Sequence, residues 1–282
     1  VNICHILLDS LQKICLMHGI EVDYYKKLFQ TIGNIIELIE KDDMPKYLLF
    51  LENVFPYMDN YNYQKGMKEI IQELKNLLKH KDIGTDSDRA LLLDFQATLE
   101  IKPEKAIKLE KDAIALIKEI TEENAHLASN LHSNLGGLYR MNGYPDLARE
   151  HMEKGLFLLE QYNLLYTHDG IPQFTNYAMF LAEQQAPEKG ISVLQKLSKG
   201  IKEYNSDCCL DYATVQESLA TIYLMTANLP KAKTHFKRAC KIYEKIWADE
   251  PEMIEAKYQE IQELYPQIGF CIGKNLSGLL TK

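Results

Sequence analysis

The amino-acid sequence predicts an all-α fold built from stacked antiparallel helix hairpins. The first observation is a repeat of 42 residues: Leu135-Gly136 recurs two periods later as Leu219-Ala220, with the related pair Tyr177-Ala178 between them. The second is that apolar residues follow helical spacing, and no run alternates apolar and polar residues as a strand would. The third is that the prolines and several of the glycines fall at regular places, near the expected ends of helices. A fixed long period indicates repeated units that bury their apolar faces against their neighbours.

Small side chains recur where the two helices of one unit are expected to cross. On the first helix of each unit they are Gly136, Ala178 and Ala220. On the second helix they are Ala106, Ala148, Gly190 and Ala232, with a further small position at Ala113, Gly155 and Ala239. A larger side chain at such a crossing would push the two backbones apart. We expect the large residues around these positions to fill the remaining space; they are Leu138, Tyr139, Met152, Phe157 and Leu158.

The order of the helices follows from short breakers, because proline is favoured in the first turn of a helix and disfavoured inside one. The predicted hairpins are 3–18 with 22–40, 45–57 with 62–80, 86–101 with 104–120, 123–142 with 146–163, 171–185 with 188–204, 208–227 with 230–247, and 251–264 with 268–280.

We divide these helices into three segments. Residues 1–85 form N-terminal hairpins, interpreted as degenerate repeats or alternatively as a distinct helical cap. Residues 86–250 form the repeats of period 42, and residues 251–282 form C-terminal capping helices. A terminal repeat must cover the last apolar surface and present a polar face outward.

The repeated residues resemble the tetratricopeptide repeat. The pattern Leu-[Gly/Ala]-x-x-Tyr followed by Ala-x-x-x-[Phe/Met] is present over about 86–247. The period is longer than the usual value of about 34 and resembles that of kinesin-light-chain-like repeats. An aromatic residue expected three positions before the Leu is present only as Phe174, and His132 and Gln216 depart from the pattern. The resemblance implies a right-handed superhelical solenoid of helix hairpins.

Composition and charge restrict the classes of function. A net charge of −8 argues against general nucleic-acid binding, which needs clustered Lys and Arg. No apolar stretch reaches the length of about 18 residues that a membrane span requires, and the N-terminus shows no signal-peptide pattern. The six cysteines form no C-x-x-C pair and match no zinc spacing, so we expect reduced thiols, no metal and a cytoplasmic protein. Because the chain starts without Met, the presence of an upstream domain is left open.

The candidate binding surface follows from the resemblance. In peptide-binding tetratricopeptide domains the first helix of each unit lines a concave groove, and the residue before the Leu-Gly pair points into it; here that residue is Asn134, Asn176 or Ser218. A side-chain amide can pair with a peptide bond of an extended ligand. The predicted peptide-binding residues are Asn130, Asn134, Arg140, Asn176, Glu217, Ser218 and Thr221. The alternative role of the asparagines is to hold adjacent helices together by hydrogen bonds.

The charge of the predicted binding residues indicates the charge of the peptide. Recognition of an acidic C-terminal tail needs several Lys and Arg residues on the first helices, and the chain offers Arg140 and Arg89 there, so we expect a neutral or mixed-charge peptide. The densest basic run, between Lys231 and Lys241, lies on a second helix and is expected to face solvent, with an acidic partner as the alternative.

The predicted function is a non-catalytic scaffold that binds a protein or peptide, without a cofactor. No H-E-x-x-H, P-loop, G-x-G-x-x-G or G-x-S-x-G motif occurs. The alternative is a peptide-sensing regulatory domain of a bacterial regulator whose DNA-binding or output domain is absent from this chain. Self-association into a homo-oligomer through apolar surface at either end stays open.

Overall fold

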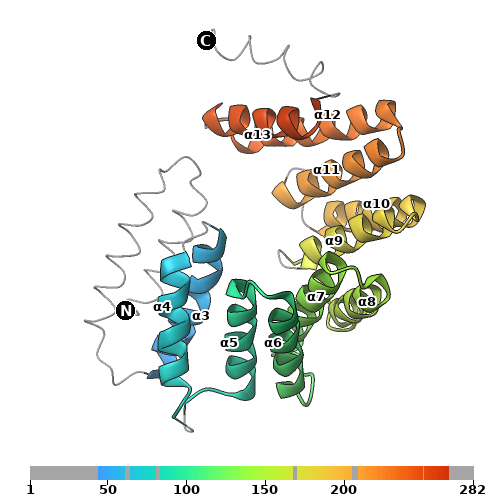
Figure 1. Cartoon of the computed structure of the whole chain (residues 1–282). Coiled ribbons are helices and arrows are strands. Elements are labelled where there is room, and N and C mark those ends of the chain that lie inside the picture. The colour runs from blue at the N-terminus through green and yellow to red at the C-terminus, as the bar shows by residue number, and fades with distance from the viewer. Residues whose placement is uncertain are drawn as a thin grey trace. The chain divides into compact units, whose positions relative to one another are not determined.

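A computed structural model describes residues 44–60, 64–80, 83–167, 170–204, 209–249 and 251–266. These residues form helices and turns and contain no strand (Figure 1). The prediction of an all-α fold is therefore confirmed. The predicted helices within 1–43 and over 268–280 lie outside the described residues, as do Cys4, Cys15, Cys208 and Cys271.

The chain divides into two compact units, residues 1–142 and 143–282. The helices described in the first unit are α3 (Met44–Asn60), α4 (Gln64–Leu77), α5 (Asp86–Leu99), α6 (Pro103–Leu116) and α7 (Ala125–Met141). Each packs against the next along the chain, as α5 and α6 show in Figure 1. The first helices α5 and α7 also touch. A further apolar contact joins α3 and α5: the ring of Phe55 stacks on that of Phe95, with ring centroids 3.8 Å apart.

The second unit contains α8 (Pro145–Gln161), α9 (Gly170–Glu183), α10 (Pro187–Tyr204), α11 (Leu210–Met225), α12 (Leu229–Ile246) and α13 (Pro251–Leu264). Consecutive helices pack on one another, and the first helices α9 and α11 also touch. The last helix, α13, buries Ile254, Tyr258 and Ile261 in a cluster with Phe236 and other residues of α11 and α12. In this way α13 covers apolar surface of the last hairpin.

The repeat extends to the backbone at both ends of the helices. Helices begin at Pro103, Pro145 and Pro187, which are 42 residues apart. The second residue after the end of a first helix has positive φ three times at the same interval: 79° at Gly143, 59° at Gln185 and 56° at Ala227. After the last two, Ala186 N–H donates to the Leu181 carbonyl and Asn228 N–H to the Tyr223 carbonyl, at 2.9 and 2.7 Å. These hydrogen bonds form the Schellman pattern that closes a helix end.

The small residues of the repeat are buried, as a place at the crossing of two helices requires. Gly136, Ala178 and Ala220 are buried, and so are the small residues of the second helices. Gly190 shows the reason: a Cβ there would lie 2.4 Å from the Ala178 carbonyl oxygen, so α9 and α10 approach at a distance that only glycine permits.

One expectation about packing is wrong. Phe157 is predicted to fill space around these crossings, but its side chain is 62% exposed. Its neighbours Leu156 and Leu158 are buried at 8% and 6% exposure and occupy the core-facing side of α8 instead. A helix of this width presents only part of its circumference to the core, so Phe157 is directed outward.

Candidate peptide-binding surface

The predicted residues of unit 1 lie on α7. Asn134 is exposed, and its Nδ2 donates a hydrogen bond of 2.9 Å to Asp94 Oδ1 on α5. One turn earlier, the Nδ2 of Asn130 lies 3.5 Å from His126 Nδ1. Arg140 is partly buried near the end of the helix. The Asn134 bond joins two first helices and uses only the nitrogen of the amide.

Asp94 forms a carboxyl pair with Glu110 of α6, which lies beneath it. The two side chains are hydrogen-bonded, and Glu110 is 2% exposed, with no hydrogen-bond partner for its Oε2. Burial, together with the nearby Asp94 charge, raises the pKa of Glu110 to about 10. Burial also raises the pKa of Asp94, and the charge of Asp59 on α3 adds to it. Glu110 therefore holds its proton at neutral pH.

A second carboxyl pair joins α3 and α5. Burial is the main cause that raises the pKa of Glu52 to about 8, and the charge of Asp88 and a hydrogen bond to it act in the same direction. Asp88 also caps α5, because it accepts hydrogen bonds from the Thr85 backbone N–H and hydroxyl. Carboxyl groups thus accumulate along α3 and α5 in unit 1.

The predicted residues of unit 2 lie on α9 and α11. Asn176 of α9 is exposed, and within the described part of the chain its side chain has no hydrogen-bond partner. On α11, the Ser218 hydroxyl donates to the Thr214 carbonyl at 3.0 Å. The Thr221 hydroxyl donates to the Glu217 carbonyl at 3.0 Å and lies 3.0 Å from the Tyr265 hydroxyl.

Glu217 is held by helices on both sides. Its carboxylate lies 3.2 Å from Lys257 Nζ of α13 and accepts a 2.9 Å hydrogen bond from the Tyr243 hydroxyl of α12. Burial raises the pKa of Glu217, whereas Lys257 and Tyr243 act to lower it. The structure therefore brings Glu217, Ser218 and Thr221 together on α11 and gives Glu217 and Thr221 partners near the C-terminal end of the unit.

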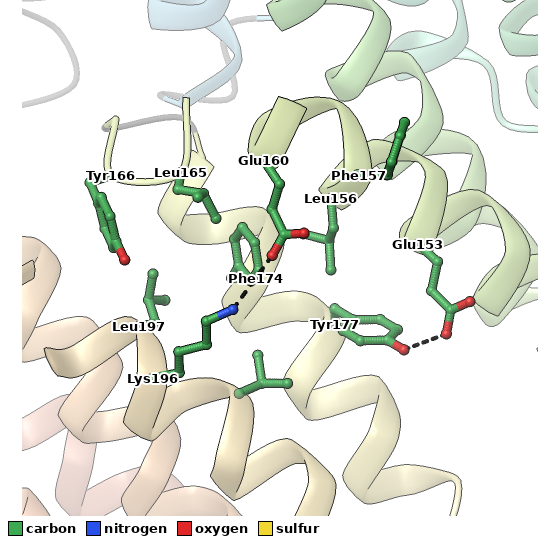
Figure 2. A pocket seen from close by; sticks show the side chains of 11 residues that line it. Glu153, Leu156, Phe157, Glu160, Leu165, Tyr166, Phe174, Tyr177, Lys196 and Leu197 are labelled. Atoms are coloured by element: carbon green, nitrogen blue, oxygen red, sulfur yellow. Dashed lines mark hydrogen bonds and ion pairs between the residues drawn. The ribbon is translucent and has the colours of Figure 1, made fainter. Parts of the chain in front are cut away.

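A cavity in unit 2, which the sequence did not predict, opens among α8, α9, α10 and the segment that follows α8. Its volume is about 340 Å³. The lining residues are Glu153, Leu156, Phe157, Glu160, Leu165, Tyr166, Phe174, Tyr177, Val193, Lys196 and Leu197. Figure 2 shows the Phe174 ring among these side chains, beside the ion pair of Lys196 Nζ and Glu160 Oε1 at 3.7 Å.

Two polar features and one glycine shape this cavity. The Tyr177 hydroxyl donates to Glu153 at 2.6 Å, and burial followed by this bond raises the pKa of Tyr177 to about 12 (Figure 2). A Cβ at Gly200 would lie 2.1 Å from the Tyr166 hydroxyl oxygen, so this glycine makes room for the Tyr166 ring. The aromatic character of Phe174 at its repeat position was the one sequence signal for the site.

The described residues offer neither a metal site nor a membrane span. No group of three or more His, Cys, Asp or Glu side chains there could hold a metal ion. Among the same residues, no helix is long and apolar enough to cross a bilayer. Cys209 and Cys240, the two cysteines within the described ranges, are free thiols.

Comparison with solved structures identifies the fold. No protein-family model and no curated protein matches the chain. A putative kinesin light chain from Podosopora anserina with nearly identical TPR-like repeats shares 14% identity at a TM-score of 0.57, over 73% of this chain and 99% of that one. The apo form of RapI shares 14% identity at a TM-score of 0.60, over 96% of this chain and 76% of that one. This chain has a tetratricopeptide-like repeat fold.

The tetratricopeptide-like fold is also that of a Rap protein complexed with Competence and Sporulation Factor. It shares 17% identity at a TM-score of 0.54, over 94% of this chain and 75% of that one. At such identities the likeness establishes the fold, which confirms the resemblance found in the repeated residues.

Proposed function

We propose that this protein is a non-catalytic, cytoplasmic scaffold that binds a peptide or protein segment along its first helices. The observation that carries the proposal is the position of two amides. Asn134 on α7 and Asn176 on α9 are one period apart, and both are exposed. The small residues two positions after them, Gly136 and Ala178, are buried. An exposed amide at the same repeat position in each unit offers a donor and an acceptor to a peptide group of an extended ligand.

Other residues of the surface supply the surroundings of the ligand. Asn130 and Arg140 flank Asn134 on α7, whereas Glu217, Ser218 and Thr221 on α11 are engaged in hydrogen bonds within unit 2. We therefore assign the main contacts to the asparagines. The Rap protein complexed with its factor supports the proposal as an example of a ligand-binding protein with this fold.

The test is affinity capture with a matched asparagine control. The variant Asn134→Ala/Asn176→Ala removes both amides, and we expect it to bind a partner captured by the wild-type protein about 30-fold more weakly, since each hydrogen bond contributes about 1 kcal/mol. The control Asn76→Ala removes an exposed amide from the second helix α4 and should retain the partner. Equal retention by the double variant and the control would count against the first helices as the binding surface.

A second candidate function is a peptide-sensing regulatory domain whose output domain lies outside this chain. The likeness to two Rap structures over 94% and 96% of this chain favours it. In that role a bound peptide changes the pitch of the stacked hairpins. Small-angle scattering with and without a binding peptide distinguishes the two: a sensor changes its radius of gyration, and a static scaffold keeps it.

A further inference from the structure

Unit 1 carries a row of carboxyl groups without matching cations. They are Glu52 and Asp59 on α3, Asp88 and Asp94 on α5, and Glu110 on α6. Within the described ranges, no Lys or Arg forms an ion pair with any of them. Nearby basic residues are engaged elsewhere: Arg89 donates to the carbonyls of residues 83–85, and Lys111 Nζ lies 6.0 Å above the Tyr139 ring.

The side chain of Glu110 indicates that these carboxyl groups lack a binding partner. It is 2% exposed, it is hydrogen-bonded to Asp94, and its Oε2 has no hydrogen-bond partner. An unsatisfied buried acceptor costs about 1–3 kcal/mol. Glu217 of unit 2 shows how the same chain satisfies a buried carboxylate, with Lys257 at 3.2 Å and the Tyr243 hydroxyl at 2.9 Å.

We propose that Asp94, with Glu110 beneath it and Asp59 beside it, receives the Arg or Lys side chain of a bound peptide. The inference rests on the proposed function and names the chemistry of the ligand. Asp94 lies on the same surface as Asn134, which fixes the carboxylate by its 2.9 Å hydrogen bond and keeps its amide oxygen for the peptide backbone. Arginine suits the site because its planar donors match the two oxygens of a carboxylate.

The buried carboxyl pair couples this binding to a proton. Burial keeps Glu110 protonated in the free protein, and the carboxyl group that faces it is that of Asp94. Asp94 is in turn faced by the carboxyl group of Asp59 and the neutral amide of Asn134. A cation placed against Asp94 favours the ionised form of Glu110. Binding of a basic side chain therefore lowers the pKa of Glu110 and is accompanied by release of protons to the buffer.

A peptide selection tests the inference while the natural ligand is unidentified. The whole chain is used to select from a random phage-displayed peptide library, and the variant Asp94→Asn/Glu110→Gln is used in parallel. Both substitutions keep the side-chain shape, and the amide introduced by Glu110→Gln reproduces the neutral form of the carboxyl group. A matched variant, Glu73→Gln/Asp112→Asn, makes the same two types of substitution at exposed positions on the second helices α4 and α6.

The expected result is that peptides selected by the wild-type chain and by the matched control carry Arg or Lys at a fixed position, and that this preference is lost with Asp94→Asn/Glu110→Gln. A selected peptide should bind the variant roughly tenfold or more weakly, the value of one charge-assisted hydrogen bond. Calorimetry in two buffers of different ionisation enthalpy should show proton release by the wild type and none by the variant.

The other outcomes separate two failures. If peptides are selected but carry no basic preference, or if the variant keeps that preference, the inference is overturned and the proposed function stands. If no peptide is enriched by the wild-type chain, both the inference and peptide binding by this surface are overturned.

Discussion

At the scale of single residues, Gly190 and Glu110 show two opposite effects of a buried residue on the packing of the helices. Gly190 lies at a crossing where a Cβ would meet the Ala178 carbonyl oxygen at 2.4 Å. Glu110 occupies a buried position on a second helix, where apolar packing would ordinarily be expected. The first residue serves the packing of the helices, whereas the second weakens it unless a ligand supplies a cation.

The glycine positions predict a pair of opposite effects. Gly190→Ala should destabilise unit 2 by about 1–3 kcal/mol, because the new methyl group forces α9 and α10 apart. Gly137→Ala is the control on α7: nothing lies within 4 Å of a Cβ there, so it should stabilise unit 1 by about 0.5–1 kcal/mol through helix propensity. Urea unfolding of both variants measures the two changes, and a neutral Gly190→Ala would contradict the close crossing.

The carboxyl pairs predict a dependence of stability on pH. The pKa of Glu110 is raised from 4.5 to about 10 in the folded state. Its contribution to the stability of the fold is therefore fully present below about pH 4.5 and is lost as the pH rises toward 10. Glu52, with a pKa raised to about 8, acts in the same direction. We expect Glu110→Gln to match the wild type near about pH 4 and to be the more stable protein at about pH 8, because the wild type loses up to about 1.4 kcal/mol for each pH unit between the two pKa values.

Thermal melts of wild type and Glu110→Gln across this pH range measure the difference, with Glu73→Gln as an exposed control. Parallel curves for all three proteins would show that Glu110 is ionised in the folded state at neutral pH, contrary to its burial beside Asp94.

At the scale of helices, the period governs the ends of elements as well as their faces. Gln185 and Ala227 adopt positive φ at the position that Gly143 occupies in the preceding repeat. Residues with a Cβ lose roughly 1–2 kcal/mol in this conformation, and glycine does not. The chain therefore carries two helix ends that are less stable than the equivalent one at Gly143.

These ends give a direct prediction. Ala227→Gly should stabilise unit 2 by about 1 kcal/mol, because the positive φ of 56° is retained without the Cβ penalty. Gly143→Ala should lower stability by a similar amount. Chemical denaturation of the two variants gives the comparison, and a loss of stability in Ala227→Gly would mean that residue 227 has ordinary helical φ in solution.

Helix starts and crossings could be predicted from the sequence because proline and small residues act locally. The end of α6 could not: the sequence predicts a helix that reaches residue 120, but α6 ends at Leu116. No glycine or proline marks this point. Instead, the Asn124 side chain accepts from Thr121 N–H and donates to the Glu119 carbonyl, so side-chain hydrogen bonds form a turn there.

Part of the candidate site could be predicted, because the 42-residue repeat places Asn134 and Asn176 at equivalent positions. Their hydrogen-bond partners were not, because Asp94 lies 40 residues from Asn134 and reaches it only through packing of α5 on α7. Gln216 is similar: its departure from the aromatic pattern is explained by hydrogen bonds to Ser198, His235 and Arg238 on the two second helices around it.

At the scale of the whole molecule, each unit has its own distribution of charge. Unit 2 pairs its buried carboxylate with Lys257, whereas unit 1 leaves five carboxyl groups along α3, α5 and α6 without ion pairs among the described residues. The net charge of −8 is in keeping with a basic ligand. Electrostatic attraction of this kind accelerates association and weakens with salt.

Ligand binding by the first helices is tested most directly by photo-cross-linking. A selected peptide that carries a benzophenone group is irradiated with the whole chain, and the adducts are located by mass spectrometry. We predict adducts on first helices, namely on α5 and α7 of unit 1 or on α9 of unit 2. Adducts confined to α8 and α10, around the cavity of Phe174 and Lys196, would contradict binding by the first helices.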